Sequence, residues 1–143
     1  MINKIWLTNL ALVFALSGYA QDEILGGWAT PEGNMIVEIY KAQEGLYAGK
    51  VAWLKKPTDK KGNPHKDRMN PDKQLQDRNI LGMDMLENLK YTDGKWYGTL
   101  YTPKKGRKVD AELNLNKDEK LDINVSFMGF SKTVQWIRTE LPK

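Results

Sequence analysis

The alternation of apolar and polar residues between positions 109 and 127 is the feature that most narrows the fold of this chain. Every second residue of 109–115 and 121–127 is apolar: Val109, Ala111, Leu113, Leu115, Leu121, Ile123, Val125 and Phe127. Charged, amide and hydroxyl side chains occupy most positions between them. Because successive side chains of a strand point to opposite faces, these segments predict strands with one face on a core and the other in water.

Turn residues divide the rest of the chain into similar short segments, and no sustained helical period interrupts them. We expect strands at 24–29, 35–40, 46–54, 81–91, 95–102, 109–115, 121–127 and 134–136, with a break near Glu87-Asn88 in the fourth. The pair Asp93-Gly94 is a strong hairpin signal between two of them. About eight antiparallel strands with short links favour a single all-β, up-and-down barrel, because closure removes exposed sheet edges.

A glycine pair ahead of a tryptophan predicts how such a barrel closes. Gly26 and the following glycine allow close approach of the backbone, and the indole of Trp28 is large enough to plug one end of a core. Trp136 and Arg138 lie near the other end of the sequence. We expect Arg138 to lie across the Trp28 ring as a cation–π contact.

The first twenty residues have the composition of a secretory signal peptide. Lys4 precedes an almost uninterrupted apolar run over 5–16, and small residues follow at 17–20. We expect cleavage after Ala20, a single domain over 21–143, and a periplasmic or extracellular location. The run is too short to span a membrane stably. The chain has no cysteine, which excludes a lipid-anchored cysteine at the cleavage point and any disulfide.

A long polar connection over 55–80 interrupts the strand pattern. Asn70 is a good helix N-cap and Pro71 suits the first helical position, so about two turns of helix are expected there, with Leu75 facing inward. The connection is basic, and so is the turn near 104: the cations are Lys55, Lys56, Lys60, Lys61, Lys66, Arg68, Lys104, Lys105, Arg107 and Lys108. If the two basic segments meet at one end of the barrel, they form a positive rim.

Motifs spread over nearly the whole of 21–143 carry a family resemblance. They are Leu25-Gly26-Gly27-Trp28, Val37-Glu38-Ile39, Tyr47, Gly49-Lys50-Val51, Trp53-Leu54, Asn70-Pro71-Asp72, Leu75, Arg78, Leu81-Gly82, Trp96, Gly98, Tyr101, Pro103, Gly106, Gln135-Trp136 and Arg138. In this order they resemble the bacterial domain-of-unknown-function family 2147, which implies a small exported β-rich domain. The set of Gly26, Trp28 and Arg138 is also similar to the lipocalin (calycin) signature, which implies a lipocalin-like barrel.

No catalytic, metal or cofactor motif stands out, and we expect no cofactor. His65, the single histidine, lies in a polar loop without an evident partner. Glu38 is flanked by apolar residues and is the acid to consider for acid-catalysed chemistry, but its simpler interpretation is an exposed strand residue paired with Lys50.

Aromatic residues at strand ends indicate where a ligand would bind. Most tryptophans and tyrosines are expected to fill the interior, but a pocket at the barrel mouth is the usual form of a small-molecule site. We assign candidate ligand contacts to Trp53, Asn70, Asp72, Arg78 and Tyr101. Arg78 would pair with an acidic head group.

Three functions therefore remain open. The first is a non-enzymatic exported barrel that binds a small apolar or amphipathic ligand. The second is an envelope-associated protein that contacts anionic surfaces through its basic loops without spanning the membrane. The third is a hydrolase or isomerase that uses an acidic residue. Nothing indicates nucleic acid, and the oligomeric state is not predicted.

Overall fold

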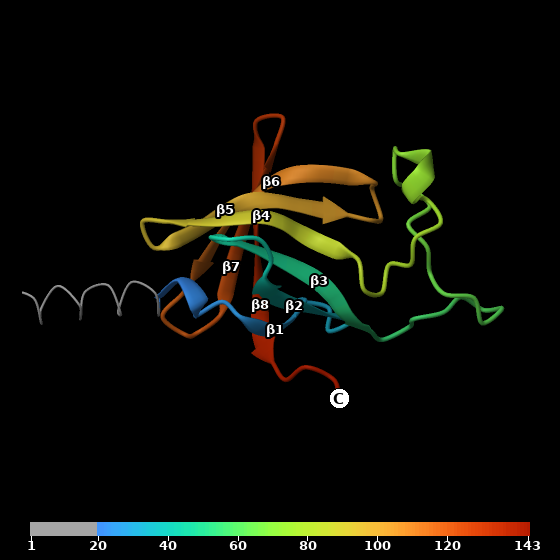
Figure 1. Ribbon diagram of the computed structural model, residues 1–143, viewed down its shortest axis with the longest axis horizontal. Helices are drawn as coiled ribbons and strands as arrows, with labels where there is room; N and C mark the ends of the chain where they lie inside the picture. The colour runs from blue at the N-terminus through green and yellow to red at the C-terminus, as the bar shows by residue number, and fades with distance from the viewer. Residues whose placement is uncertain (1–19) are drawn as a thin grey trace, which may run out of the picture.

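The computed structural model describes residues 20–143, which form a closed barrel of eight antiparallel strands (Figure 1). The strands are β1 Gly26–Ala29, β2 Met35–Lys41, β3 Leu46–Leu54, β4 Asp84–Thr92, β5 Lys95–Thr102, β6 Arg107–Leu115, β7 Leu121–Phe127 and β8 Phe130–Thr139. Each strand pairs with the next, and β8 returns to pair with β1. The predicted up-and-down barrel is confirmed. The predicted leader lies outside the described residues except for Ala20.

Most of the alternating residues form the core as the sequence predicts, but Phe127, the last of them, is 37 % exposed. Leu113, Leu121 and Ile123 are fully buried, and Ala111 is 4 % exposed. The aromatic residues Trp28, Trp96, Trp136, Tyr47 and Tyr101 are also buried, so side chains fill most of the interior. None of the helices formed by residues 20–143 has the length and apolar character needed to cross a membrane.

One residue inserted in β3 changes which side chains face inward near its end. Val51 pairs with Val37 and Trp53 pairs with Ile36, so Ala52 is an extra residue without a partner on β2. Such a bulge reverses the inward and outward sides of the strand beyond it. Strict alternation along 46–54 predicts that Trp53 lies on the same side as Val51, but the bulge instead turns Leu54 toward the core.

Trp28 and Arg138 meet at the seam between β1 and β8, as expected, whereas Trp136 is buried but pairs with Leu121 of β7 and lies outside the seam pairs. The guanidinium carbon of Arg138 lies 4.2 Å from the centre of the Trp28 ring, and the two residues are direct partners across the strands. Arg138 also donates to the carbonyl of Leu25 at 3.0 Å, and the Trp28 indole donates to the carbonyl of Ile24 at 2.8 Å. A Cβ on Gly27 would lie 2.7 Å from the carbonyl oxygen of Thr139, so only glycine fits there.

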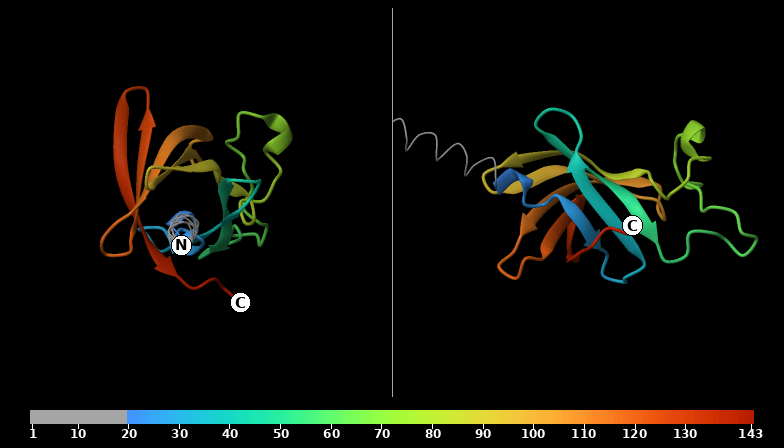
Figure 2. Two further views of the ribbon diagram at one scale, coloured as in Figure 1. Left: turned by 60° about the vertical axis from the view of Figure 1, so that its left-hand side comes forward. Right: turned by 60° about the horizontal axis from the view of Figure 1, so that its bottom comes forward.

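The two ends of the barrel differ. The segment 21–25 lies across the end where β3 and β5 begin: Asp22 accepts a hydrogen bond from the Tyr47 hydroxyl at 2.6 Å, and the Trp96 indole donates to the carbonyl of Gln21 at 3.1 Å. Ile24 is fully buried. Three of the seven connections between strands also lie at this end. Because strand direction alternates, the other four lie at the opposite end, including the long connection over 55–83 (Figure 2).

Candidate functional site

The connection between β3 and β4 is an ordered structure that folds back on itself at the open end of the barrel. Its two arms pair as short antiparallel segments: Ile80 donates its backbone N–H to the carbonyl of His65 at 2.9 Å, and Asp67 donates to the carbonyl of Arg78 at 3.0 Å. Lys66 and Asn79 form an isolated bridge between these two bonds. The arms therefore hold each other in register before any side chain is considered.

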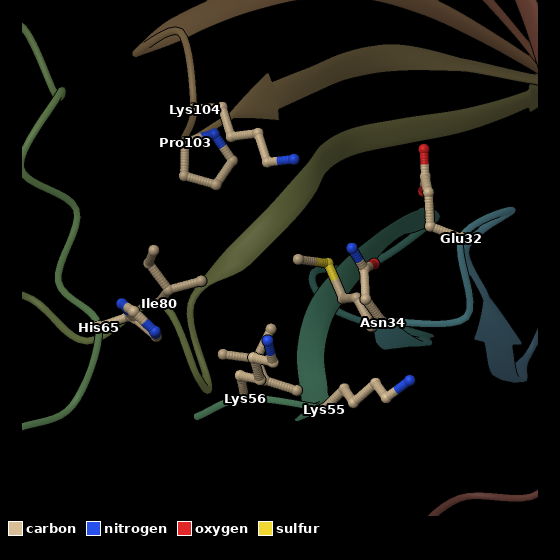
Figure 3. A pocket seen from close by; sticks show the side chains of 10 residues that line it. Glu32, Asn34, Lys55, Lys56, His65, Ile80, Pro103 and Lys104 are labelled. Carbon is tan, nitrogen blue, oxygen red and sulfur yellow. The ribbon is translucent and has the colours of Figure 1, made fainter. Parts of the chain in front are cut away.

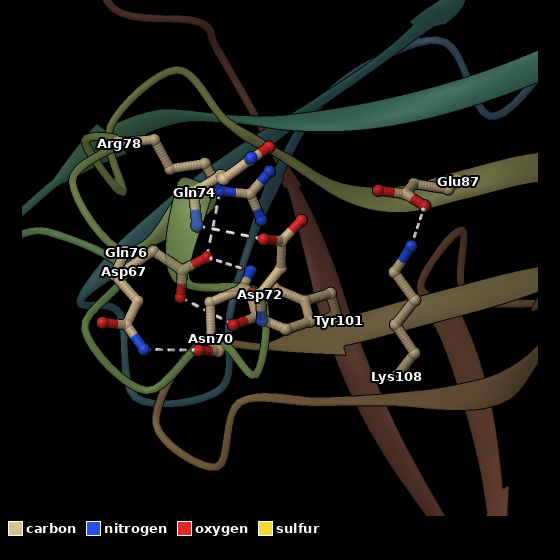
Figure 4. A network of polar contacts seen from close by, with 9 residues as sticks. All are labelled: Asp67, Asn70, Asp72, Gln74, Gln76, Arg78, Glu87, Tyr101 and Lys108. Carbon is tan, nitrogen blue, oxygen red and sulfur yellow. Dashed lines mark hydrogen bonds and ion pairs between the residues drawn. The ribbon is translucent and has the colours of Figure 1, made fainter.

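A buried carboxylate joins this connection to the barrel wall (Figure 4). Asp67 has no exposed surface, and its oxygens accept three side-chain hydrogen bonds. One oxygen accepts from the Tyr101 hydroxyl at 2.6 Å, and the other accepts from the Arg78 guanidinium at 2.9 Å and from the Asn70 amide at 2.8 Å. Tyr101 lies near the end of β5, so the cluster ties three positions of the connection to a strand of the barrel.

The cluster satisfies its buried polar atoms. No buried side-chain nitrogen or oxygen of residues 20–143 lacks a hydrogen-bond partner. Arg78 also lies 5.5 Å from the centre of the Tyr101 ring, measured from its guanidinium carbon. Burial and the hydrogen bond to Asp67 raise the pKa of Tyr101 to about 12, because both favour the neutral hydroxyl.

The same connection also lies very close to the turn between β5 and β6. Gly106 has φ of +58°, and a Cβ there would lie only 1.8 Å from the carbonyl oxygen of Met69. No other residue fits this approach without displacing backbone. The connection is therefore bonded to the barrel through Asp67 and Tyr101, and its backbone at Met69 lies directly against the β5–β6 turn.

The helix in the connection is shorter than predicted and begins later. It is a single 3₁₀ turn, η1 (Lys73–Leu75), capped by Asp72, whose carboxylate accepts from the backbone of Gln74 at 3.0 Å. Asn70 is not the cap, because its amide group is committed to the Asp67 cluster and to a turn in which it accepts from the backbone of Asp72. Leu75 is 37 % exposed, so the prediction that it faces inward is wrong.

A pocket of about 570 Å³ opens beside this anchored connection (Figure 3). Its apolar surface comes from three parts of the fold: Met35 and Leu54 are partners across β2 and β3, Ile80 lies near the end of the connection, and Pro103 follows β5. The polar groups around it are Glu32, Asn34, Lys55, Lys56, His65 and Lys104. Three lysines and one carboxylate give it a net positive charge.

The structure brings some of the predicted ligand contacts together, but not on this pocket. Asn70, Arg78 and Tyr101 meet at Asp67, Asp72 caps the 3₁₀ turn, and none of these residues lines the pocket. Trp53 is likewise absent from the lining. A direct contact between these five side chains and a ligand stays a prediction.

Sequence reasoning missed Asp67 and the pocket-lining apolar residues. Asp67 stands between Lys66 and Arg68 in a basic stretch and has the same local signature as the exposed Asp59, so the sequence offers no signal for its burial. The sequence did not indicate the inward orientation of Leu54, because it gave no sign of the bulge at Ala52. His65, expected to be solvated, is exposed but also lines the pocket.

The other candidate groups have simple structural roles. Glu38 lies opposite Lys50, with 3.7 Å between its carboxylate oxygen and the ammonium nitrogen, as the simpler interpretation predicts. Within residues 20–143, no group of three or more histidine, aspartate or glutamate side chains is arranged to hold a metal ion.

The fold and this open end define a small antiparallel barrel of the lipocalin type. The chain belongs to a family described as an uncharacterized protein conserved in bacteria, domain of unknown function 2147, which it matches over residues 26–138. Among solved structures, the chain is similar to a protein described as HP1028 from the human pathogen Helicobacter pylori, which belongs to the lipocalin family. The identity is 22 %, the TM-score is 0.66, and the match covers 82 % of this chain and 83 % of the other. No curated protein matches the sequence.

Proposed function

We propose that the protein is a non-enzymatic binding protein that takes a small amphipathic molecule with an acidic head group into the pocket at the open end. The observation that carries this proposal is the lining of the pocket, which combines apolar side chains with three lysines and one carboxylate. An apolar pocket with a few polar groups is the usual form of a small-molecule site, and about 570 Å³ lies within its usual size range. An eight-stranded barrel is either filled by its side chains or holds one small ligand, and here the space for a ligand lies at the open end beside the filled core.

The Asp67 cluster supports the proposal by holding the pocket wall in place. His65 and Ile80, which line the pocket, stand two residues from Asp67 and Arg78 respectively, and Pro103 stands two residues after Tyr101. Three wall residues are thus fixed by one buried cluster. A preformed wall lowers the entropy cost of binding, since the connection is ordered before the ligand arrives.

The charges favour an anionic head group over a neutral one. Lys55, Lys56 and Lys104 have no carboxylate within 4.0 Å among residues 20–143, whereas Glu32 is the single carboxylate on the lining. Lysines of the basic connection and of the basic turn therefore line the same pocket. This meets the condition stated above for a positive rim at one end of the barrel. Such a rim attracts anions at low ionic strength.

The test uses a fluorescent fatty acid such as cis-parinaric acid and its neutral methyl ester. The purified protein should bind the acid at micromolar concentrations, and Leu54→Trp should weaken binding of both probes by about tenfold or more, since the indole fills the pocket. Lys55→Gln with Lys104→Gln should weaken binding of the acid only. Lys117→Gln with Lys120→Gln, in the turn at the opposite end, is the matched control.

Two results would overturn the proposal. One is the absence of saturable binding of either probe. The other is undiminished binding by a Leu54→Trp variant whose urea unfolding midpoint equals that of the wild type.

We also propose that the protein is exported, on the strength of the signal-like residues 1–20. Mass determination of the protein recovered from the periplasm or medium of a bacterial culture tests this. A chain that begins at Gln21 supports export, whereas an intact chain confined to the cytoplasm contradicts it.

A further inference from the structure

The tip of the hairpin between β7 and β8 exposes three large apolar side chains. Phe127 pairs with Phe130 across a two-residue turn of Met128 and Gly129, both with positive φ, which is the tight turn that two-residue hairpins favour. Phe127 is 37 % exposed, Met128 82 % and Phe130 81 %. The hairpin extends beyond the neighbouring strands in Figure 1 and in the left view of Figure 2, so its tip projects from the barrel.

The incomplete seam explains why nothing in the barrel covers this tip. β1 pairs only with Ile137–Thr139 of β8, so residues 130–136 have β7 as their one strand neighbour among residues 20–143. Along β7, burial is complete at Ile123 and is lost toward Phe127. The apolar row of the barrel interior thus continues into solvent.

Cations surround the exposed tip. The guanidinium carbon of Arg107 lies 4.3 Å from the centre of the Phe127 ring. Lys132 is exposed two residues after Phe130, and neither cation has a carboxylate within 4.0 Å in the described part of the chain. Lys108 also lies against the tip but is paired with Glu87 at 2.9 Å, and Asp110 is the carboxylate in the same shallow hollow. The local balance is positive.

We propose that this tip is a membrane-docking element that inserts Phe127, Met128 and Phe130 into the interface of an anionic lipid bilayer. Exposed apolar side chains flanked by cations match the two layers of such a surface: the rings enter the boundary of the acyl chains while Arg107 and Lys132 reach the phosphates. The tip projects as a convex edge, so it suits a deformable surface better than a rigid groove. A symmetric pair of tips would bring the same cations of two copies together, which disfavours self-association.

This inference does not depend on the ligand pocket, because the two sites share no residue. Binding to vesicles can therefore be lost while binding of the fatty-acid probe is kept. The converse also holds for the Leu54→Trp variant, which should dock normally.

The absence of cysteine allows a direct test with the purified protein. Met128→Cys and, as the matched control, Lys117→Cys in the turn at the opposite end would each carry one environment-sensitive fluorophore. With vesicles of phosphatidylglycerol and phosphatidylcholine, the label at 128 should shift to shorter wavelength and the label at 117 should not. Vesicles of phosphatidylcholine alone should give a smaller shift, because they lack the anionic head group.

A second readout measures partitioning by flotation with the same vesicles. Replacing all three tip side chains by serine should lower the partition coefficient by about tenfold or more. Tyr97→Ser removes an aromatic residue that is 44 % exposed near the start of β5 and should change nothing. The proposal is overturned if the label at 128 does not shift, if both labels shift equally, or if the triple serine variant partitions like the wild type. It is also overturned if the tip instead supports a dimer, seen as a concentration-dependent sedimentation coefficient that the serine variant loses without any vesicle binding by the wild type.

Discussion

Replacing Asp67 by alanine should destabilise the open end of the barrel more than any other single carboxylate substitution in the connection. The change removes the acceptor of three hydrogen bonds and leaves the Arg78 guanidinium, 30 % exposed at its side chain, without its ion-pair partner. It also leaves the hydroxyl of Tyr101, a residue only 3 % exposed, without the acceptor that the structure gives it. Breaking a fully buried pair from one side costs about 3 to 5 kcal/mol, and the cost here should lie toward the lower end because water reaches part of the Arg78 side chain.

Milder substitutions separate the contributions of the individual contacts to this loss of stability. Tyr101→Phe removes one hydrogen bond to a charged acceptor, and its cost should be about 1.5 to 3 kcal/mol. Because the two residues are in contact, their double-mutant cycle should give a coupling energy of about 0.5 to 3 kcal/mol. Asp59→Ala is the matched control, since Asp59 is exposed and accepts only the backbone N–H groups of Lys61 and Asn63.

Urea unfolding followed by tryptophan fluorescence measures the free energy of global unfolding. Trypsin digestion under native conditions measures local unfolding of the lysine-rich connection. Asp67→Ala should lower the free energy of unfolding and speed cleavage within 55–80, whereas Asp59→Ala should alter each only slightly. If Asp67→Ala and Asp59→Ala behave alike in both assays, or if the coupling to Tyr101 is zero, the cluster does not hold the connection.

Two further predictions concern the rest of the barrel. Trp28→Ala should lower the free energy of unfolding by about 3 to 5 kcal/mol, because the ring is fully buried, and an unchanged urea midpoint would show that Trp28 does not stabilise the core. The raised pKa of about 12 for Tyr40, caused first by its hydrogen bond to Asp84, and for Tyr101, caused first by burial, makes stability depend on alkaline pH. The neutral hydroxyls contribute fully below the ordinary pKa of 10, and the contribution is lost as pH rises toward about 12, so the free energy of unfolding should fall over this window. Tyr101→Phe should make that fall shallower, and parallel curves for the variant and the wild type would contradict the assignment.

The barrel was predictable because its signal is local and repeated. Alternation such as that of Leu113 and Leu115, with turns such as Asp93-Gly94, gives strand positions independently of tertiary context. The boundaries were less predictable. β8 begins at Phe130, four residues before the expected start, because its first residues extend along β7 beyond the barrel and carry no clear apolar alternation.

The candidate site was predictable only in part, since its geometry depends on contacts that the sequence does not encode locally. The end of β5 and both ends of the connection that contains Asn70 lie at the open end, as strand direction requires, and a direct contact of these residues with a ligand stays a prediction. The partner that unites them, Asp67, has no local signature of burial. Because of the extra residue Ala52 in β3, Leu54 rather than Trp53 faces the core, and no residue in that stretch indicates a bulge.

The short seam between β1 and β8 also sets the order in which the fold can be completed. Arg138 on β8 donates to the carbonyl of Leu25, 113 residues earlier in the chain, so this contact has almost the greatest loop-closure cost that the molecule offers. β1 cannot be paired on both sides until Ile137–Thr139 has left the ribosome. The meander from β2 to β7 can assemble through neighbouring hairpins, but it remains an open sheet with two free edges until then. The pairing of β1 with β8 is therefore the strand pairing that can form last, although β1 can pair with β2 as soon as that neighbouring hairpin forms.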